Sequence, residues 1–216
     1  KGVQGVVVEP LGEPNEYRIS GRFGSGMIGI EIHAHGSSTG FKGLKAGRAE
    51  VAMASRTIKS KEVKALQSFG NMRAFGSEHV VAIDGLAIIV HPSNYVSQMP
   101  VDTIAKVFSG KITNWKEVGG PDRVINLYAR DNNSGTFDTF KSLVLRKKVK
   151  LSARAKRFES NDELSDLVAN DVAGIGFVGL ASVRDAKALA VSDLGTVPQK
   201  PEVAFVATED YPLSRR

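Results

Sequence analysis

The chain has 216 residues, of which 42% are hydrophobic, and this composition suffices for one large domain or two modest lobes. It contains no cysteine, so disulfides, thiolate zinc sites and cysteine nucleophiles are excluded. No run of about 18 apolar residues occurs, and residues 1–20 lack the pattern of a signal peptide, so we expect no membrane insertion. The formal net charge of +6 favours anionic partners. The few aromatic residues are not interleaved with the basic ones, so we expect no nucleic acid as a partner.

The first half of the chain alternates between strand-like and helix-like patterns. Gly47 follows the first helical pattern as a stop, and Ser60 precedes the second as a cap. The pair Asp84-Gly85 interrupts the most apolar stretch, which we interpret as a buried strand pair or as one strand with a bulge. The predicted elements are a strand over 27–34, a helix over 39–46, a strand over 51–54, a helix over 61–69 and the apolar strand segment over 80–90.

The second half continues this alternation. Gly110 ends its first helix, the only tryptophan (Trp115) lies in a loop-like segment, and Asn161 caps a later helix. The order of elements predicts an α/β protein with largely parallel sheets. The predicted elements are a helix over 100–108, a loop over 112–120, a strand over 124–129, a helix over 136–145, a strand over 157–159, a helix over 162–170, a strand over 174–178, a short helix over 180–185, and strands over 188–191 and 203–207.

We expect the chain to cross between two lobes twice, near residues 75–81 and again near residues 192–201. These crossings define lobe I as residues 1–78 with 192–216, and lobe II as residues 79–191. Two lobes joined in this way would leave a ligand cleft between them.

Two segments have the composition of an anion-binding helix start. Residues 35–40 and 130–136 each lie between a predicted strand and a predicted helix and are rich in Ser, Thr and Gly. The unpaired N–H groups and the dipole at a helix start favour negative charge, and glycine lets the backbone approach a ligand. Arg130 adds a guanidinium fork that suits two oxygens of a tetrahedral anion. Ordinary helix capping is the alternative explanation. The candidate ligands are Ser37, Ser38, Thr39, Arg130, Ser134, Gly135 and Thr136.

Three further residues are candidates for the same site. Asp84 lies in the most apolar stretch, where an unpaired carboxylate is costly. It could accept the proton of HPO₄²⁻, which sulfate does not carry, or it could form a structural Asx turn. Ser55 and Arg56 follow the strand predicted over 51–54, and the carboxyl ends of strands face ligand crevices in open α/β sheets. An ordinary surface arginine is the alternative for Arg56.

Other chemistries lack the residues that they need. His33 and His35 share one face of a strand, but no third metal ligand is near in sequence, so we predict no metal site and no cofactor. No G-x-S-x-G elbow surrounds Ser37, Ser38 or Ser134, and no Walker sequence occurs. We therefore expect no catalytic residues and no enzyme.

Four stretches of the sequence resemble the periplasmic phosphate-binding proteins of ABC importers, over about residues 30–178. They are AHGSSTGFKGLKAGRAEVAMASR at 34–56, IDGLAIIVHPSN at 83–94, FSGKITNWKEVGG at 108–120 and ARDNNSGTFDTF at 129–140. The resemblance implies a two-lobe periplasmic-binding-protein-like fold of type 2, with mixed sheets flanked by helices and a ligand cleft between the lobes. It also implies that Ser38 and its neighbours donate to phosphate from the first lobe, and that Arg130, Ser134, Gly135 and Thr136 donate from the second.

Two features depart from the pattern of that family. Some members carry a carboxylate directly after the serine that ends the second strand, but Arg56 stands there in this chain, which leaves Asp84 as the candidate reader of the phosphate proton. The family also begins with a strand and a Gly-Ser/Thr-rich turn into a first helix. Only residues 24–26 resemble such a turn here, and we predict no helix after them. We therefore expect lobe I to lack its first strand and helix, which would weaken phosphate binding.

The expected function is that of an extracytoplasmic solute-binding protein, periplasmic or extracellular, that binds inorganic phosphate for ABC-type uptake or scavenging without catalysis. The resemblance implies an ABC permease complex as the partner, and we expect a monomer. Two alternatives stay open. One is a cell-envelope scaffold domain of the same fold with weak or no phosphate binding, and the other is a phosphoryl-transfer hydrolase that uses the same residues.

Overall fold

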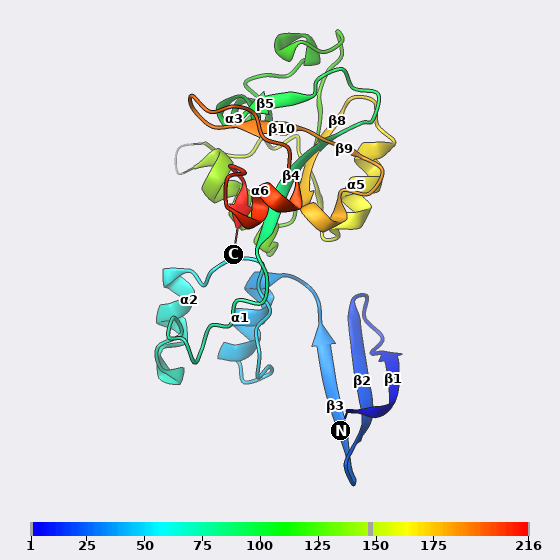
Figure 1. The fold of residues 1–216 in the computed structure, drawn as a ribbon, viewed down its shortest axis with the longest axis vertical. Coiled ribbons are helices and arrows are strands. Elements are labelled where there is room, and N and C mark those ends of the chain that lie inside the picture. Colours follow the sequence, from blue (N-terminus) through cyan, green and yellow to red (C-terminus); the bar gives the residue numbers. More distant parts are fainter. Residues whose placement is uncertain (1, 147–148, 216) are drawn as a thin grey trace. The chain divides into compact units, whose positions relative to one another are not determined.

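A computed structural model describes residues 2–146 and 149–215. The chain forms two compact units, Lys1–Gly36 and Ser37–Arg216, and each combines the elements shown in Figure 1. Helices and strands alternate through most of the second unit, as the sequence predicts for the α/β class. The two lobes predicted over residues 1–78 with 192–216 and over 79–191 stay a prediction.

The first unit is an antiparallel sheet of three strands, β1 (Gln4–Pro10), β2 (Glu16–Phe23) and β3 (Gly26–His33). The strand predicted over 27–34 is β3, whereas β1 and β2 are outside the predicted elements. Ile19 lies opposite Ile30, and Arg18 lies opposite Glu31. Because successive side chains point to opposite faces of a strand, this register places the apolar pair on one face and the ion pair on the other.

The second unit is built on a sheet with the strand order β11-β4-β8-β6-β7, in which β9 also pairs with β4. A smaller sheet pairs β5 with β10. The strands are β4 (Asp84–Val90), β5 (Gln98–Pro100), β6 (Asn126–Arg130), β7 (Lys156–Phe158), β8 (Gly174–Gly179), β9 (Lys187–Ala188), β10 (Ala190–Ser192) and β11 (Ser214–Arg215).

The helices of the second unit begin at or near the predicted caps. Ser160 rather than Asn161 caps α5, since its hydroxyl accepts the Glu163 N–H at 3.2 Å. A π-helix (Lys141–Leu145) continues α4, so the helix predicted over 136–145 has two geometries. The α-helices are α1 (Ser37–Lys45), α2 (Ser60–Ala65), α3 (Val101–Phe108), α4 (Gly135–Phe140), α5 (Asn161–Ala169) and α6 (Val203–Ala207), and the 3-10 helices are Gln67–Phe69, Trp115–Val118 and Leu180–Ser182.

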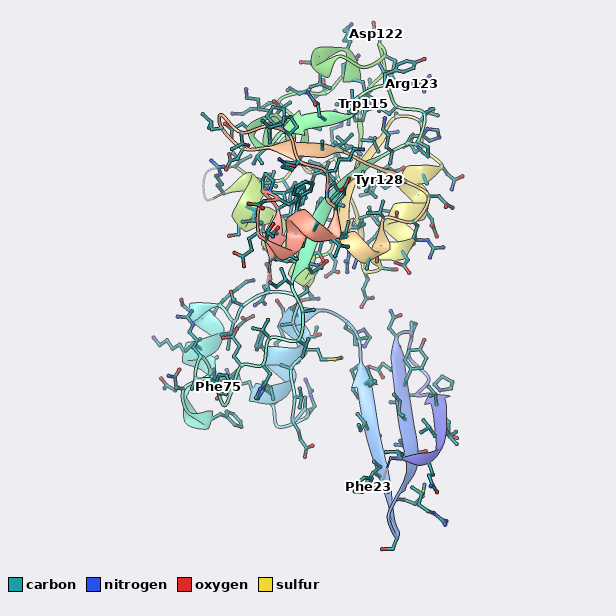
Figure 2. The ribbon with its side chains drawn as sticks, in the orientation of Figure 1. Phe23, Phe75, Trp115, Asp122, Arg123 and Tyr128 are labelled. Atoms are coloured by element: carbon teal, nitrogen blue, oxygen red, sulfur yellow. The ribbon has the colours of Figure 1, made fainter. Side chains whose placement is uncertain are left out.

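The hydrophobic core surrounds β4 and β8, whose residues from Gly85 to Val90 and from Gly174 to Gly179 are all buried. Phe140 and Phe177 stack with ring centroids 4.0 Å apart. Trp115 is fully buried, and its indole Nε1–H donates to the Ala173 carbonyl at 2.9 Å (Figure 2). The FSGKITNW stretch is therefore part of the core structure rather than a ligand.

Three expectations about the elements are wrong. Residues 203–207 form helix α6 and not a strand, and this helix lies across β4 (Figure 1) with Val206 buried. Periodicity cannot distinguish a helix from a strand in an apolar run of five residues. Residues 51–54 and 80–83 are not strands, because within the described chain no neighbouring strand pairs with them. The sheets are mixed rather than largely parallel, because β4 runs antiparallel to β8, β9 and β11.

Candidate functional site

The first predicted helix start is the N-terminus of α1. Ser37 is buried, and its Oγ accepts the backbone N–H of Ser55 at 3.0 Å. The backbone N–H of Ser38 donates to the Asn133 carbonyl at 3.3 Å. Since Asn133 belongs to the loop that precedes α4, the two predicted helix starts lie next to each other in space. Thr39 occupies the first turn of α1.

The second helix start is the N-terminus of α4, where Ser134 is the cap. Its Oγ accepts the Phe137 N–H at 3.2 Å. Gly135 faces the first helix start so closely that an added Cβ would overlap Ser37 Oγ and Ser55 Oγ and would lie 3.0 Å from Ser37 Cβ. Only glycine fits this position, because any side chain would push the two helix starts apart. The structure thus brings Ser37, Ser38, Ser55, Ser134 and Gly135 together.

Arg56 connects these helix starts to acidic side chains. Its Nε donates to Asp138 at 2.8 Å, its Nη1 and Nη2 donate to the Glu62 carboxylate at 2.8 and 2.7 Å, and Nη2 also donates to Ser38 Oγ at 3.1 Å. The Arg56 side chain is only 7% exposed. With its guanidinium engaged by two carboxylates, Arg56 is a buried bridge between α1, α2 and α4 and not a surface arginine.

Asp138 is a residue of this site that the sequence analysis missed. Its side chain is 3% exposed and accepts from Arg56, from Lys59 Nζ at 2.5 Å and from Lys141 Nζ at 2.8 Å. Burial raises the pKa of this carboxyl, but the bonds from Lys141 and Lys59 outweigh burial and hold the pKa below its ordinary value. An acidic residue in the first turn of a helix was visible in the sequence, whereas its partners on other elements were not.

Arg130 ends β6 and is buried, and its fork is directed at protein acceptors. Its Nε donates to the Phe158 carbonyl at 3.3 Å, and its two Nη groups donate to Asn161 Oδ1 and to the Glu159 carbonyl. Burial lowers the pKa of this guanidinium; Asp131 opposes the shift and Arg215 adds to it. Arg130 therefore lies within electrostatic range of both groups.

Asp84 and Thr136 meet at a residue that sequence reasoning did not single out, Arg215. Its Nε donates to Asp84 Oδ2 at 3.0 Å, and its Nη1 donates to Thr136 Oγ1 at 3.1 Å. The other Asp84 oxygen accepts the Gly85 N–H at 2.8 Å. Both carboxylate oxygens of Asp84 are thus bonded, one of them to its neighbouring backbone N–H as the structural alternative for this residue requires.

A pocket of about 340 Å³ opens beside these residues, within the size range of small-ligand pockets. Its lining includes Arg56, Lys59, Asp138, Ser142 and Arg215. Arg56 and Arg215 each face the pocket and also donate to a hydroxyl of a helix start, on Ser38 and Thr136 respectively.

Two searches over residues 2–146 and 149–215 gave no result. No group of three or more His, Cys, Asp or Glu side chains is placed to hold a metal ion. No helix there is long and apolar enough to cross a membrane.

Comparison with known proteins identifies the family. A family model described as a PBP superfamily domain matches residues 25–216. The phosphate-binding protein PstS of Bacillus subtilis is 32% identical over 187 residues, which are 85% of this chain and 57% of that protein. Protein SphX of Synechococcus elongatus is 34% identical over 201 residues, 87% of this chain and 58% of SphX. The chain thus spans less than two thirds of the length of these relatives.

Solved structures agree with this match. A candidate phosphate ABC transporter substrate-binding protein from Clostridium perfringens, solved with bound phosphate, is 32% identical and superposes with a TM-score of 0.73 over 84% of this chain and 69% of that one. An ABC-type phosphate transport receptor from Vibrio cholerae, also 32% identical, gives a TM-score of 0.63 over 84% of this chain and 70% of that one. The α/β fold of periplasmic binding proteins is confirmed, and the chain belongs to the family of PBP superfamily domains.

Proposed function

We propose that this chain binds inorganic phosphate as an extracytoplasmic solute-binding protein for ABC-type uptake, in association with an ABC permease and without catalysis. The relatives named above are phosphate-binding proteins of such systems. One observation in this chain supports the proposal most directly, namely the meeting of the two helix starts at Gly135. Convergent N–H groups and hydroxyls at helix starts are suited to a tetrahedral anion.

The proposed ligand groups are the helix starts themselves. Ser37, Ser38 and Thr39 contribute from α1, with Ser55 beside them, and Ser134, Gly135 and Thr136 contribute from α4. Arg130 and Arg56 supply positive charge near the anion, although most of their donors are bonded to protein groups. We further propose that the protein acts as a monomer in the periplasm or outside the cell.

The first test is isothermal titration calorimetry of the full chain with inorganic phosphate. We expect one phosphate per chain with a dissociation constant in the micromolar range or tighter, about −8 kcal/mol. A dissociation constant weaker than roughly 1 mM, about −4 kcal/mol, would reject the proposal and favour a scaffold role.

The second test is the variant Gly135→Ala. The added Cβ overlaps the hydroxyls of Ser37 and Ser55 and separates the helix starts, so we expect phosphate affinity to fall by at least about 100-fold, or 2.7 kcal/mol. Gly76→Ala is the matched control, since its Cβ meets nothing within 4 Å. Equal affinities of the two variants would show that phosphate does not bind at this junction.

A further inference from the structure

The hydroxyl groups of the proposed site share one hydrogen-bonding pattern. Each accepts an N–H from the protein: Ser37 from the Ser55 backbone at 3.0 Å, Ser38 from Arg56 at 3.1 Å, Ser134 from the Phe137 backbone at 3.2 Å, and Thr136 from Arg215 at 3.1 Å. A hydroxyl has a single proton to donate. With an N–H directed at its oxygen, each hydroxyl is left to donate that proton to a ligand, so these groups form a site of donors.

A donor site suits four unprotonated oxygens, whereas HPO₄²⁻ also carries a proton that needs an acceptor. Most carboxylates near the site are already committed to cations. Asp84 accepts from Arg215, Glu62 accepts from Arg56, and Asp138 accepts from Arg56 and Lys59. Asp84, the residue expected to read the phosphate proton, is therefore poorly placed to do so.

Asp131 differs from these carboxylates. Its Oδ1 accepts the Asn133 N–H at 2.6 Å, but its Oδ2 is buried and accepts no hydrogen bond from the residues that the structure describes. A buried acceptor without a partner is costly, by about 1–3 kcal/mol, and such groups are rare enough in native proteins to require an explanation.

The position of Asp131 connects it to both helix starts. Its backbone carbonyl accepts the Ser134 N–H at 3.3 Å, and Asn133, which is bonded to its side chain, accepts the Ser38 N–H at 3.3 Å. Asp131 also acts electrostatically on Arg130. One short loop thus carries the unpartnered carboxylate oxygen and the second helix start together.

We infer that Asp131 Oδ2 accepts the proton of the bound phosphate and so selects HPO₄²⁻ over sulfate. This inference rests on the proposed function. Protonated phosphate satisfies the buried oxygen with a charge-assisted hydrogen bond. Sulfate brings only acceptors, so it leaves Oδ2 unpaired and opposes it with like charge. The side chain of Asp131 is therefore a specificity-determining group of the site.

Calorimetry with phosphate and with sulfate tests the inference in three proteins. For the unchanged chain we expect phosphate to bind at least about tenfold more tightly than sulfate. Asp131→Asn keeps the Oδ1 acceptor for Asn133 and replaces Oδ2 by an NH₂ donor. It should lower the ratio of phosphate to sulfate affinity by about tenfold or more. Asp84→Asn is the matched control, and its ratio should stay within about twofold of that of the unchanged chain.

The outcomes separate the inference from the function on which it rests. If phosphate binds but Asp131→Asn leaves the ratio unchanged, or if Asp84→Asn lowers it instead, the inference is wrong and the proposed function stands. If the unchanged chain binds no phosphate, both are rejected. A crystal structure of the phosphate complex gives a test without any variant. We expect Asp131 Oδ2 within about 2.5–2.7 Å of a phosphate oxygen, and a separation beyond about 3.5 Å would overturn the inference.

Discussion

At the scale of single residues, the buried charges around α4 depend on partners that are distant in the chain. Arg56 and Asp138 are 82 positions apart, and Arg215 and Asp84 are 131 positions apart. Each group would be costly to bury alone, and each is stabilised by the opposite charge. Removal of one partner therefore leaves the other as an uncompensated buried charge.

Asp138→Asn should lower the free energy of unfolding at neutral pH by about 2 kcal/mol. The loss is at the low end for a buried pair, because Glu62 still neutralises Arg56. Urea unfolding, followed by the fluorescence of Trp115, measures the difference between the variant and the unchanged chain. A difference below about 0.5 kcal/mol would show that the Asp138 carboxylate adds nothing to stability.

The same pair of proteins should differ in pH dependence. Since the pKa of Asp138 in the folded chain lies below its ordinary value of 3.8, its stabilisation is complete well above that value and is lost as the pH falls through it and below. The gap between the two free energies of unfolding should therefore narrow between about pH 6 and pH 3. A gap that stays constant or widens on acidification would contradict this assignment.

The sequence could predict part of the site at this scale. Ser37, Ser38, Ser134 and Gly135 stand in short segments whose composition alone indicates helix starts, and the structure brings them together. The bonds of Arg56 and Arg215 could not be predicted, because a single sequence contains no information on which distant charges become neighbours. The orphan oxygen of Asp131 was hidden for the same reason.

At the scale of elements, the segment around Trp115 is a compact structural unit. Asn114 and Glu117 form a capping box at the start of the 3-10 helix, and Gly119 ends it with a left-handed conformation (φ 84°). The indole ring is buried with its N–H bonded to the Ala173 carbonyl. This arrangement ties the segment to the residue that precedes β8.

Trp115→Phe should destabilise the chain by about 2 kcal/mol, from a lost hydrogen bond of roughly 1 kcal/mol and a cavity of similar cost. Because the variant lacks the only tryptophan, circular dichroism must follow its unfolding in urea. Tyr95→Phe is the control, since Tyr95 is 82% exposed and its substitution should leave stability within about 0.5 kcal/mol. Equal stabilities of the two variants would show that the buried indole is not a structural anchor.

Elements with strong local signals were predictable, and those defined by pairing were not. Helices α1, α3 and α5 follow caps and periodicity in the sequence. Residues 51–54 are apolar enough for a strand, but a strand also needs a neighbour to satisfy its backbone. Residues 203–207 are equally apolar and form α6, whose Val206 packs against Gly85. Tertiary packing decided between the two structures in both cases.

At the scale of the whole molecule, the two units differ in how much of their surface they bury. Every residue of β1 and β3 is exposed or half-buried, whereas β4 and β8 are almost completely buried. A three-stranded sheet gains little stability without a hydrophobic core of its own. The first unit should therefore open more readily than the centre of the second.

Hydrogen–deuterium exchange, read by mass spectrometry, tests this difference within one sample. We expect amides of β2 to exchange roughly 100-fold faster than those of β4 and β8, because local opening of the first unit needs far less free energy than global unfolding. Peptides from α5, a helix packed on β8, provide an internal reference. Equal protection of β2 and β8 would mean that a stabilising partner covers the first unit in solution.

The central claim is that the starts of α1 and α4 hold a phosphate ion, and its most direct test is a crystal structure of the chain grown with phosphate. We predict density for one tetrahedral anion between Ser38 and Ser134, with oxygens within about 3 Å of donors from both helix starts. Density for the anion elsewhere, or none in crystals that contain millimolar phosphate, would contradict the account.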